Sequence, residues 1–225
     1  MSVNAQYNLA RPGSLPIRVA GHQRRKMFAA FVAQTGVTAA DTILDVGATS
    51  DRAYDHSNYL ESWWPTKSGI TAIGLDDSGF LEALHPGLRF IRADGCALPF
   101  ADCAFDFAHS SAVLEHVGSR ARQALFIREL LRVSRRGIFI TTPNRWFPVE
   151  FHTMLPLLHW LPAPWYRAAL DRLGYGFFAD EANLNLLSPK SLGDIAHDAG
   201  ARNFGVGSVS LAGLPTNLLL FARKR

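Results

Sequence analysis

The chain has 225 residues, of which 48% are hydrophobic and 19% charged, and its formal net charge is +4 at pH 7. This composition is typical of a globular protein and excludes a largely disordered chain. The length fits one domain with an embellishment, so we treat residues 1–225 as a single domain. Basic residues are scattered, with only two short clusters at 24–26 and 135–136, and the charge therefore does not indicate a nucleic-acid surface.

The cysteine content and the apolar segments limit where in the cell the protein is expected to act. Cys96 and Cys103 are too few for a disulfide framework, which favours reduced thiols in a cytoplasmic protein. Residues 1–18 lack an apolar core and are expected to form a loose N-terminal arm rather than a signal peptide. The apolar stretch 154–165 is interrupted by three prolines and falls short of the roughly 20 residues of a spanning helix. We expect a soluble protein, with a peripheral membrane-surface contact through residues 146–166 left open.

Alternating apolar patterns predict an α/β fold. Residues 21–36 carry apolar side chains at helical spacing. Five short apolar runs then read as buried strands, at 42–47, 70–75, 88–93, 104–109 and 137–142. Helical patterns separate several of these runs, which indicates a parallel sheet covered by helices on both faces.

The C-terminal third supplies two helices and two further strands. Residues 119–134 form an amphipathic helix. The next helix has Ser188 as its N-cap, Pro189 at its first position and Gly200 at its end. The runs 203–210 and 216–223 are joined by a short turn, so we expect an antiparallel pair at the sheet edge.

The segment 144–187 does not fit the alternation of strands and helices. It carries Trp146, Trp160 and Trp165 together with several prolines and two histidines. An insertion of this size between sheet elements commonly builds a lid over a substrate pocket. The alternative that stays open is a pair of helices packed only for stability.

Three aspartates follow three consecutive predicted strands. In open α/β sheets, ligands bind beyond the carboxyl ends of the strands. Asp45, an acidic residue just before the turn at Gly47, suits a ligand with an ammonium group. The G-x-G-x-x-G turn that cradles a pyrophosphate is absent, which speaks against NAD. Asp76, followed by Asp77, can accept hydrogen bonds from a ribose diol, and Asp94 from an exocyclic amine of adenine. Each aspartate alone could be a cap or turn residue, but three in register favour a ligand site.

At this point the sequence resembles the class I S-adenosylmethionine-dependent methyltransferases, closest to the branch acting on small molecules, lipids and glycans. The resemblance runs from about Asp41 to the C-terminus and is carried by LDVG (44–47), GLDDS (74–78), RADGCALPF (92–100), FDFAHSSAVLEHV (105–117) and LSPKSLGDIAHDAGA (187–201). It implies a Rossmann-like, seven-stranded, mostly parallel sheet with an antiparallel last strand, helices on both faces and a lid insertion before the last helix.

The resemblance also implies roles for individual residues around S-adenosylmethionine. Asp45 and Gly47 would contact the methionine part, and Ser110 or Ser111 would lie near the same end. Asp76, with the adjacent Asp77, would bind the ribose. Asp94 and Gly95 would bind the adenine. Family members usually carry two or three glycines in the first loop, whereas this chain has only Gly47. A single carboxylate needs less close approach than a pyrophosphate, and Thr49 or Ser50 could donate a hydroxyl to it.

Candidate catalytic residues follow the fourth and fifth strands. Residues after the fifth strand face the transferred methyl in this fold class, which makes Glu150 and His152 candidates for the general base. A histidine has a pKa suited to taking a proton from a hydroxyl near neutral pH. His116, in the Glu115-His116 pair, could line the pocket. Packing roles stay open for each of these side chains. No metal constellation is evident from the spacing of histidines and cysteines.

The sequence therefore predicts transfer of a methyl group from S-adenosylmethionine to a small-molecule, glycan or lipid-linked acceptor, with S-adenosylhomocysteine as product. A non-catalytic relative that only binds S-adenosylmethionine, and an NAD-dependent oxidoreductase, stay open as alternatives. Enzymes that methylate base amines typically carry Asp/Asn-Pro-Pro-aromatic after the fourth strand. This chain has His109-Ser110-Ser111-Ala112 there, so a nucleic-acid acceptor is not expected.

Overall fold

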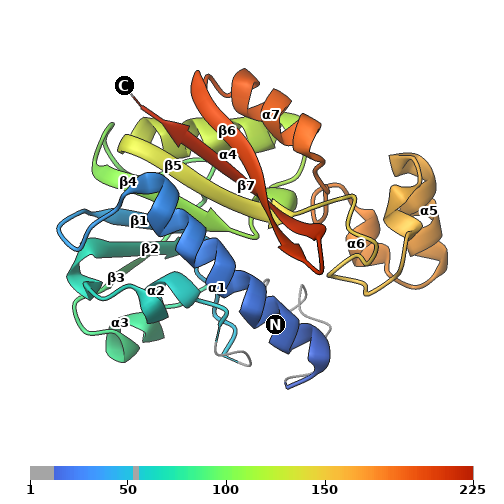
Figure 1. Ribbon diagram of the computed structural model, residues 1–225, viewed down its shortest axis with the longest axis horizontal. Coiled ribbons are helices and arrows are strands. Elements are labelled where there is room, and N and C mark those ends of the chain that lie inside the picture. Colours follow the sequence, from blue (N-terminus) through green and yellow to red (C-terminus); the bar gives the residue numbers. More distant parts are fainter. Residues whose placement is uncertain (1–12, 53–55, 225) are drawn as a thin grey trace.

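The computed structural model describes residues 13–52 and 56–224, which fold around one seven-stranded sheet (Figure 1). The strand order is β3-β2-β1-β4-β5-β7-β6. The strands are β1 (Ile43–Val46), β2 (Ile70–Gly74), β3 (Arg89–Arg92), β4 (Phe105–Ser111), β5 (Ser134–Pro143), β6 (Asn203–Leu211) and β7 (Leu214–Arg223). The first five run parallel, and β7 is antiparallel to both β5 and β6. The predicted Rossmann-like fold class is confirmed, including the antiparallel last strand.

Helices cover both faces of this sheet. The helices are α1 (Leu15–Thr35), α2 (Tyr59–Trp63), α3 (Phe80–Leu84), α4 (Arg120–Val133), α5 (Ala163–Arg172), α6 (Gly176–Ala179) and α7 (Pro189–Asp198), with 3-10 turns η2 (Lys67–Gly69), η3 (Leu114–His116) and η4 (Leu158–Trp160). Side chains of α1, α2 and α3 share one apolar cluster with one face of the sheet. Those of α4 and α7 share a second cluster with the opposite face.

Local sequence explains where the helices begin. Ser119 accepts a hydrogen bond from the Arg122 backbone amide, and Ser188 forms a capping box with Ser191, as its N-cap prediction requires. Helix α1 begins at Leu15 rather than at residue 21, because extended Ser14 and a proline in the first turn start it earlier. The expected arm therefore overlaps α1, and its residues 1–12 lie outside the described residues.

The alternation of side chains along β1 decides where Asp45 points. Leu44 and Val46 belong to the cluster with α4 and α7, whereas Ile43 belongs to the cluster with α1 and α2. Because successive side chains in a strand point to opposite faces, Asp45 lies on the α1 side with Ile43. All four residues of β1 are buried.

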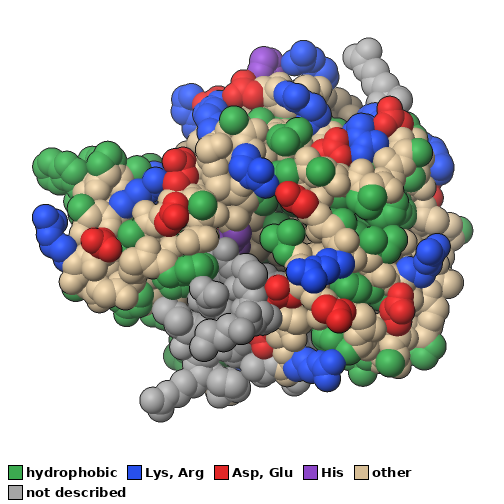
Figure 2. All heavy atoms as spheres, turned by 180° about the vertical axis from the view of Figure 1, so that it is seen from behind, with side chains coloured by type: hydrophobic (Ala, Val, Ile, Leu, Met, Phe, Trp, Pro, Cys, Tyr) green, Lys and Arg blue, Asp and Glu red, His purple; other side chains and the backbone are tan. Residues whose placement is uncertain are grey.

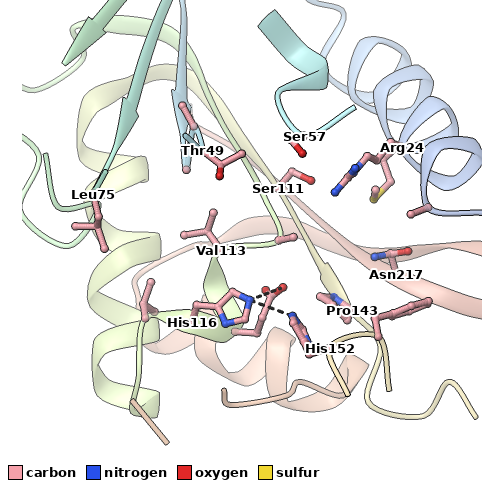
Figure 3. A pocket seen from close by; sticks show the side chains of 18 of the residues that line it. Arg24, Thr49, Ser57, Leu75, Ser111, Val113, His116, Pro143, His152 and Asn217 are labelled. Carbon is pink, nitrogen blue, oxygen red and sulfur yellow. Dashed lines mark hydrogen bonds and ion pairs between the residues drawn. The ribbon is translucent and has the colours of Figure 1, made fainter. Parts of the chain in front are cut away.

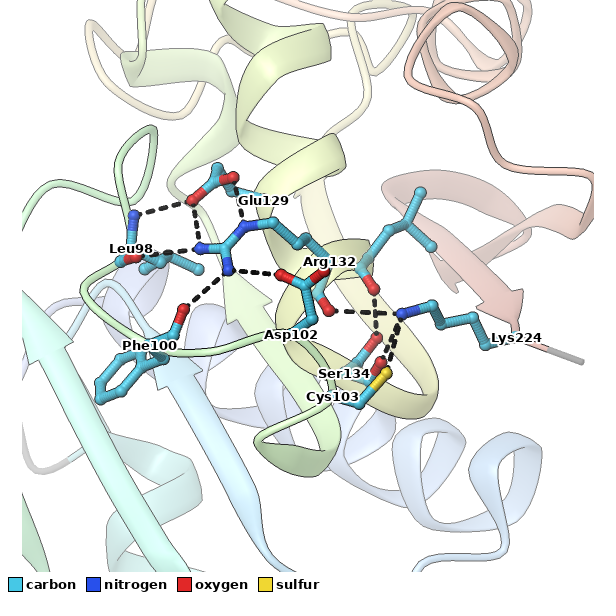
Figure 4. A network of polar contacts seen from close by, with 9 residues as sticks. Leu98, Phe100, Asp102, Cys103, Glu129, Arg132, Ser134 and Lys224 are labelled. Atoms are coloured by element: carbon cyan, nitrogen blue, oxygen red, sulfur yellow. Dashed lines mark hydrogen bonds and ion pairs between the residues drawn. The ribbon is translucent and has the colours of Figure 1, made fainter.

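A network around Arg132 fixes the loop that follows β3 (Figure 4). The guanidinium donates to the Glu129 carboxylate, to the Asp102 carboxylate and to the carbonyl oxygens of Leu98 and Phe100, all between 2.7 and 2.9 Å. Glu129 in turn accepts from the Leu98 amide at 2.9 Å. Residues 98–102 are thereby fastened to α4, which holds the segment immediately after Asp94 in place.

The insertion at 144–187 forms a lobe beside the sheet, at the right of Figure 1. It contains η4, α5 and α6 and has its own small apolar cluster of Tyr166, Leu170, Phe178 and Leu184. Asn144 and Leu187 pair as an isolated bridge at its base. Among the described residues, no helix combines the length and the apolar character needed to cross a membrane.

Candidate functional site

A cavity of about 790 Å³ lies at the carboxyl ends of β1, β2 and β4 (Figure 3). Helix α1 covers one side of it, with Ala20, Arg24 and Met27 on the wall, and the lobe covers another. The turn after β1 and the segment after β4 complete the wall. The region where the sequence predicts a ligand site therefore contains a cavity. This cavity extends from the strand ends to the lobe.

The first turn departs from β1 at Gly47, whose φ of 118° favours glycine. A Cβ there would lie 2.1 Å from Cγ2 of Val113. The amides of Gly47 and Ala48 both donate to the Ile73 carbonyl at 2.8 Å, which ties the turn to β2. Thr49 continues along the cavity wall, and its amide donates to Asn58 at 2.9 Å.

Asp45 lies beneath this turn rather than on the cavity wall. Nδ1 of His109 is 2.5 Å from Oδ1 of Asp45, and the Tyr59 hydroxyl is 3.0 Å from Nε2 of His109. One neutral tautomer satisfies both contacts, with Nδ1–H donating to Asp45 and Nε2 accepting from Tyr59. Burial raises the pKa of Asp45 to about 6 and lowers that of His109 to about 4.

The second strand end presents a buried and an exposed aspartate. Asp76 is buried and accepts a hydrogen bond from the Ser50 hydroxyl at 3.3 Å. Asp77 is exposed and accepts from the Gly79 amide at 2.9 Å, which closes a local turn. Leu75 between Gly74 and Asp76 lines the cavity with 54% of its surface exposed, so an apolar side chain is offered to a ligand there.

The third strand end places Asp94 on the cavity wall. Its carboxylate accepts from the Cys96 amide at 2.8 Å and pairs with Arg122 at 3.3 Å, while about half of its side chain stays exposed. Gly95 allows close packing, because a Cβ there would lie 2.4 Å from the Phe126 ring.

The two serines at the end of β4 differ. Ser110 is fully buried and donates to the Val46 carbonyl at 2.7 Å, which links β4 to β1. Ser111 lines the cavity, and its hydroxyl lies 2.9 Å from that of Thr141. Of the pair, Ser111 is therefore the serine that can touch a ligand.

Sequence reasoning missed the contribution of α1. The basic cluster at 24–26 was given no part in the site, yet Arg24 is half-buried and points into the cavity toward Ser111 and Ser57 (Figure 3). Arg24 lies three residues before Met27, a helical spacing that places both on the cavity side of α1. That spacing is the signal by which Arg24 could have been found.

Two histidines from different segments meet at the end of the cavity nearest the lobe. His152 is buried, and Nε2 of its ring is 3.1 Å from Nε2 of His116. Nδ1 of His152 is 2.6 Å from Oε1 of Glu150, and Nδ1 of His116 is 2.7 Å from the Asn183 carbonyl. The structure thus brings together all three catalytic candidates of the sequence, although 36 residues separate the two histidines.

The charges of this cluster follow from its contacts. Burial acts to raise the pKa of Glu150, but His152 and the amides and hydroxyl that donate to the carboxylate outweigh it and lower that pKa to about 2. Burial likewise acts against the charged form of His152, yet Glu150 raises its pKa. Burial and the neighbouring His152 lower the pKa of His116 to about 3. His152 is accordingly the donor to both neighbours, and neutral His116 accepts through Nε2 and donates to Asn183 through Nδ1.

Glu115, which the sequence singled out only through its pair with His116, completes the cluster. Its side chain is fully buried, and Thr142 donates to Oε2 at 2.8 Å. Oε1 lies 3.8 Å from Nε2 of His116 and has no hydrogen-bond partner among the described residues. Burial raises the pKa of this carboxyl. Glu115, His116 and His152 each present one ligand atom, all within 4.8 Å of one another.

Comparison with known proteins gives relatives that are described as methyltransferases. A family model described as a methyltransferase domain matches residues 58–141. An uncharacterised methyltransferase of Mycolicibacterium gilvum is 36% identical over 146 residues, which cover 61% of this chain and 52% of the relative. The Saccharomyces cerevisiae tRNA (carboxymethyluridine(34)-5-O)-methyltransferase is 39% identical over 72 residues, covering 30% of this chain and 26% of that enzyme. The chain spans about half the length, or less, of these curated relatives.

Solved structures show the same fold at low sequence identity. The crystal structure of an S-adenosylmethionine-dependent methyltransferase from Aquifex aeolicus aligns with a TM-score of 0.59 and 16% identity. The alignment covers 92% of this chain and 96% of that one. The likeness of fold therefore extends over most of the chain.

Proposed function

Because the chain belongs to the class I S-adenosylmethionine-dependent methyltransferase superfamily, we propose that it transfers a methyl group to an acceptor bound between the strand ends and the lobe, leaving S-adenosylhomocysteine. The observation that carries the proposal is the continuity of the cavity, which joins the turn after β1 to His116 and His152. S-adenosylmethionine, when bound, supplies a methyl group already activated on a sulfonium. The protein then has to position the acceptor and receive its proton.

The residues at the strand ends fit this ligand. We propose that Thr49 and Ser111 bind the methionine part on the cavity wall, with Gly47 shaping the turn above the buried Asp45 and Ser110. We propose that Asp76 binds the ribose and Asp94 the adenine amine, with Asp77 and Gly95 shaping their turns. Exposed Leu75 offers an apolar surface for the base.

Arg24 supplies what the first turn lacks. The turn contains only Gly47, so few backbone amides can approach a carboxylate closely. A half-buried guanidinium that reaches the same end of the cavity from α1 provides a charged donor for that carboxylate. We therefore assign the carboxylate of the methionine part to Arg24 rather than to a glycine-rich loop.

The histidine cluster supports an acceptor with an ionisable hydroxyl or amine. His116 and His152 lie on the cavity wall on the lobe side, opposite the residues proposed for the methionine part. Glu150 fixes the ring of His152 through Nδ1, and Nε2 of His152 meets Nε2 of His116 at the cavity end where the acceptor would lie. His116 and His152 are thus our candidates for binding the acceptor, neutral His116 is the one that can receive its proton, and Glu150 is a positioning residue.

The surface of the lobe favours a lipid-linked acceptor presented at a membrane surface. Trp146, Trp160 and Trp165 are 51%, 43% and 69% exposed, and several leucines of the lobe are exposed beside them. Hydrophobic side chains gather at the outer end of the lobe, at the left of Figure 2. Tryptophans at a protein surface suit the boundary between water and lipid. Both cysteines are free, which agrees with a reducing compartment such as the cytoplasm.

Binding and transfer assays together test this function. Isothermal calorimetry should show binding of S-adenosylhomocysteine and none of NAD. Incubation of the protein with S-adenosylmethionine carrying a radiolabelled methyl group should label the lipid-linked fraction of a cell extract. Binding of NAD without binding of S-adenosylhomocysteine would overturn the proposal. Label in RNA would identify nucleic acid as the acceptor, as the name of the yeast relative states for that enzyme. Tight binding with no label in any fraction would favour a non-catalytic relative.

A further inference from the structure

The cluster at the lobe end of the cavity has the geometry of a metal centre. Two imidazole nitrogens bound to one zinc ion at about 2.0–2.1 Å in tetrahedral geometry lie about 3.3 Å apart. Nε2 of His116 and Nε2 of His152 are separated by 3.1 Å, and Oε1 of Glu115 is 3.8 Å from the former. Two histidines and one carboxylate are a recurrent ligand set of catalytic zinc.

Each of the two histidines is held in orientation by a hydrogen bond at its other ring nitrogen. A histidine that binds a metal normally donates its other N–H to a carboxylate or a backbone carbonyl. His152 meets the Glu150 carboxylate through Nδ1, and His116 meets the Asn183 carbonyl through Nδ1. Both rings therefore present Nε2 to the same point, as the paired contacts of Figure 3 show.

The Glu115 carboxylate gives a second and independent indication. Thr142 holds Oε2, whereas Oε1 is fully buried and lacks a hydrogen-bond partner among the described residues. A buried carboxylate oxygen without a partner is costly unless a cation or donor meets it. Oε1 faces the two histidines, so an ion between the three atoms would satisfy it.

We propose that Glu115, His116 and His152 bind one divalent transition-metal ion of the zinc type, with an open coordination position facing the cavity. All three residues line the cavity, so a ligand there can reach the ion. The site is new to the sequence-based expectation, which contained no metal. Metal binding itself does not depend on the proposed function. Its catalytic consequence does rest on that function: the ion would hold the acceptor oxygen that the histidines otherwise meet directly.

Cobalt binding provides a test with a readout other than activity. The full-length protein is treated with a chelator, the chelator is removed, and Co²⁺ is titrated while visible absorption is recorded. We expect one equivalent of Co²⁺ with the absorption bands of an imidazole-ligated ion, displaced by Zn²⁺. His116→Ala and His152→Ala should abolish the bands, and Glu115→Gln and Glu150→Gln should weaken binding by about 10–100-fold.

Two controls separate site, fold and function. His197→Ala removes an exposed histidine on α7 outside the cluster and should leave Co²⁺ binding unchanged. Binding of S-adenosylhomocysteine, measured on every variant, reports on the fold and on the proposed function separately from the metal. Failure of the wild-type protein to bind Co²⁺, or unaltered binding in His116→Ala and His152→Ala, would overturn the metal site while leaving cofactor binding intact.

Discussion

Asp45 on β1 and His109 on β4, 64 residues apart in the sequence, meet beneath the first turn with Oδ1 and Nδ1 2.5 Å apart. The side chain of His109 is 1% exposed and that of Asp45 is 11% exposed. The aspartate that most resembled a ligand-binding residue in the sequence is therefore part of a buried support below the cavity. Glu61 lies in the same buried region, where burial first, and then the charge of Asp45, raise its pKa well above the ordinary value.

This arrangement predicts a pH-dependent difference between the wild-type protein and Asp45→Asn. The asparagine can still accept from Nδ1–H of His109, but it removes a buried carboxyl whose pKa burial raises from 3.8 to about 6. A raised pKa contributes stability that is present below pH 3.8 and is lost as the pH rises through 6. Relative to the variant, the wild-type free energy of unfolding should fall by about 2.4 kcal/mol between pH 4 and pH 7.

Urea unfolding of both proteins across this range measures that difference. A difference that stays constant from pH 4 to pH 7 would show that the carboxyl titrates normally.

Arg24→Gln should weaken binding of S-adenosylhomocysteine by about 10–100-fold, because a charged hydrogen bond contributes roughly 1.5–3 kcal/mol. The cavity-facing position of Arg24 on α1 carries this expectation. Arg25→Gln is the matched control, since Arg25 is exposed and stacks over Trp63 outside the cavity. Calorimetry on the two variants checks it, and equal affinities would remove Arg24 from the site.

Gly47→Ala should destabilise the protein by about 2–5 kcal/mol, through strain at a φ of 118° and a clash with Val113. The Gly47→Ala/Val113→Ala double variant should relieve the clash but not the backbone strain. It should therefore regain only part of the lost stability. Guanidinium unfolding of the single and double variants measures this coupling. Full recovery in the double variant would mean that the turn adapts without strain.

The strands followed from short-range patterns and the seven-stranded sheet from the resemblance to a known family, whereas the site depended on long-range contacts. Buried parallel strands give continuous apolar runs such as 70–75, and caps such as Ser188 mark helix starts, so both could be read locally. Asp45 could not, because both faces of β1 are buried and an acidic residue there is consistent with either face.

The histidine cluster shows the same limit more sharply. His116 and His152 were candidates one at a time, but their contact depends on how the lobe folds back on the end of β5. Glu115 was noted only through its pair with His116, because nothing local distinguishes a buried carboxylate from an exposed one. The metal geometry appears only when the three are placed together.

The exposed tryptophans of the lobe predict binding to lipid vesicles. Trp146, Trp160 and Trp165 lie outside the small cluster that holds the lobe together, so replacing all three with alanine should leave the fold intact. Interfacial binding scales with the apolar area inserted, and the triple variant should therefore bind phosphatidylcholine vesicles about tenfold more weakly or not at all. Leu84→Ala/Leu125→Ala is the control, because these exposed leucines lie on α3 and α4, away from the lobe.

Vesicle sedimentation measures both variants beside the wild-type protein. Equal loss of binding in the leucine control would indicate a general effect of surface hydrophobicity rather than a docking end on the lobe. Transfer activity toward a water-soluble acceptor fragment should survive in the triple variant, because the three tryptophans are not on the cavity wall. Loss of that activity together with vesicle binding would place the tryptophans in the acceptor site instead of at a membrane contact.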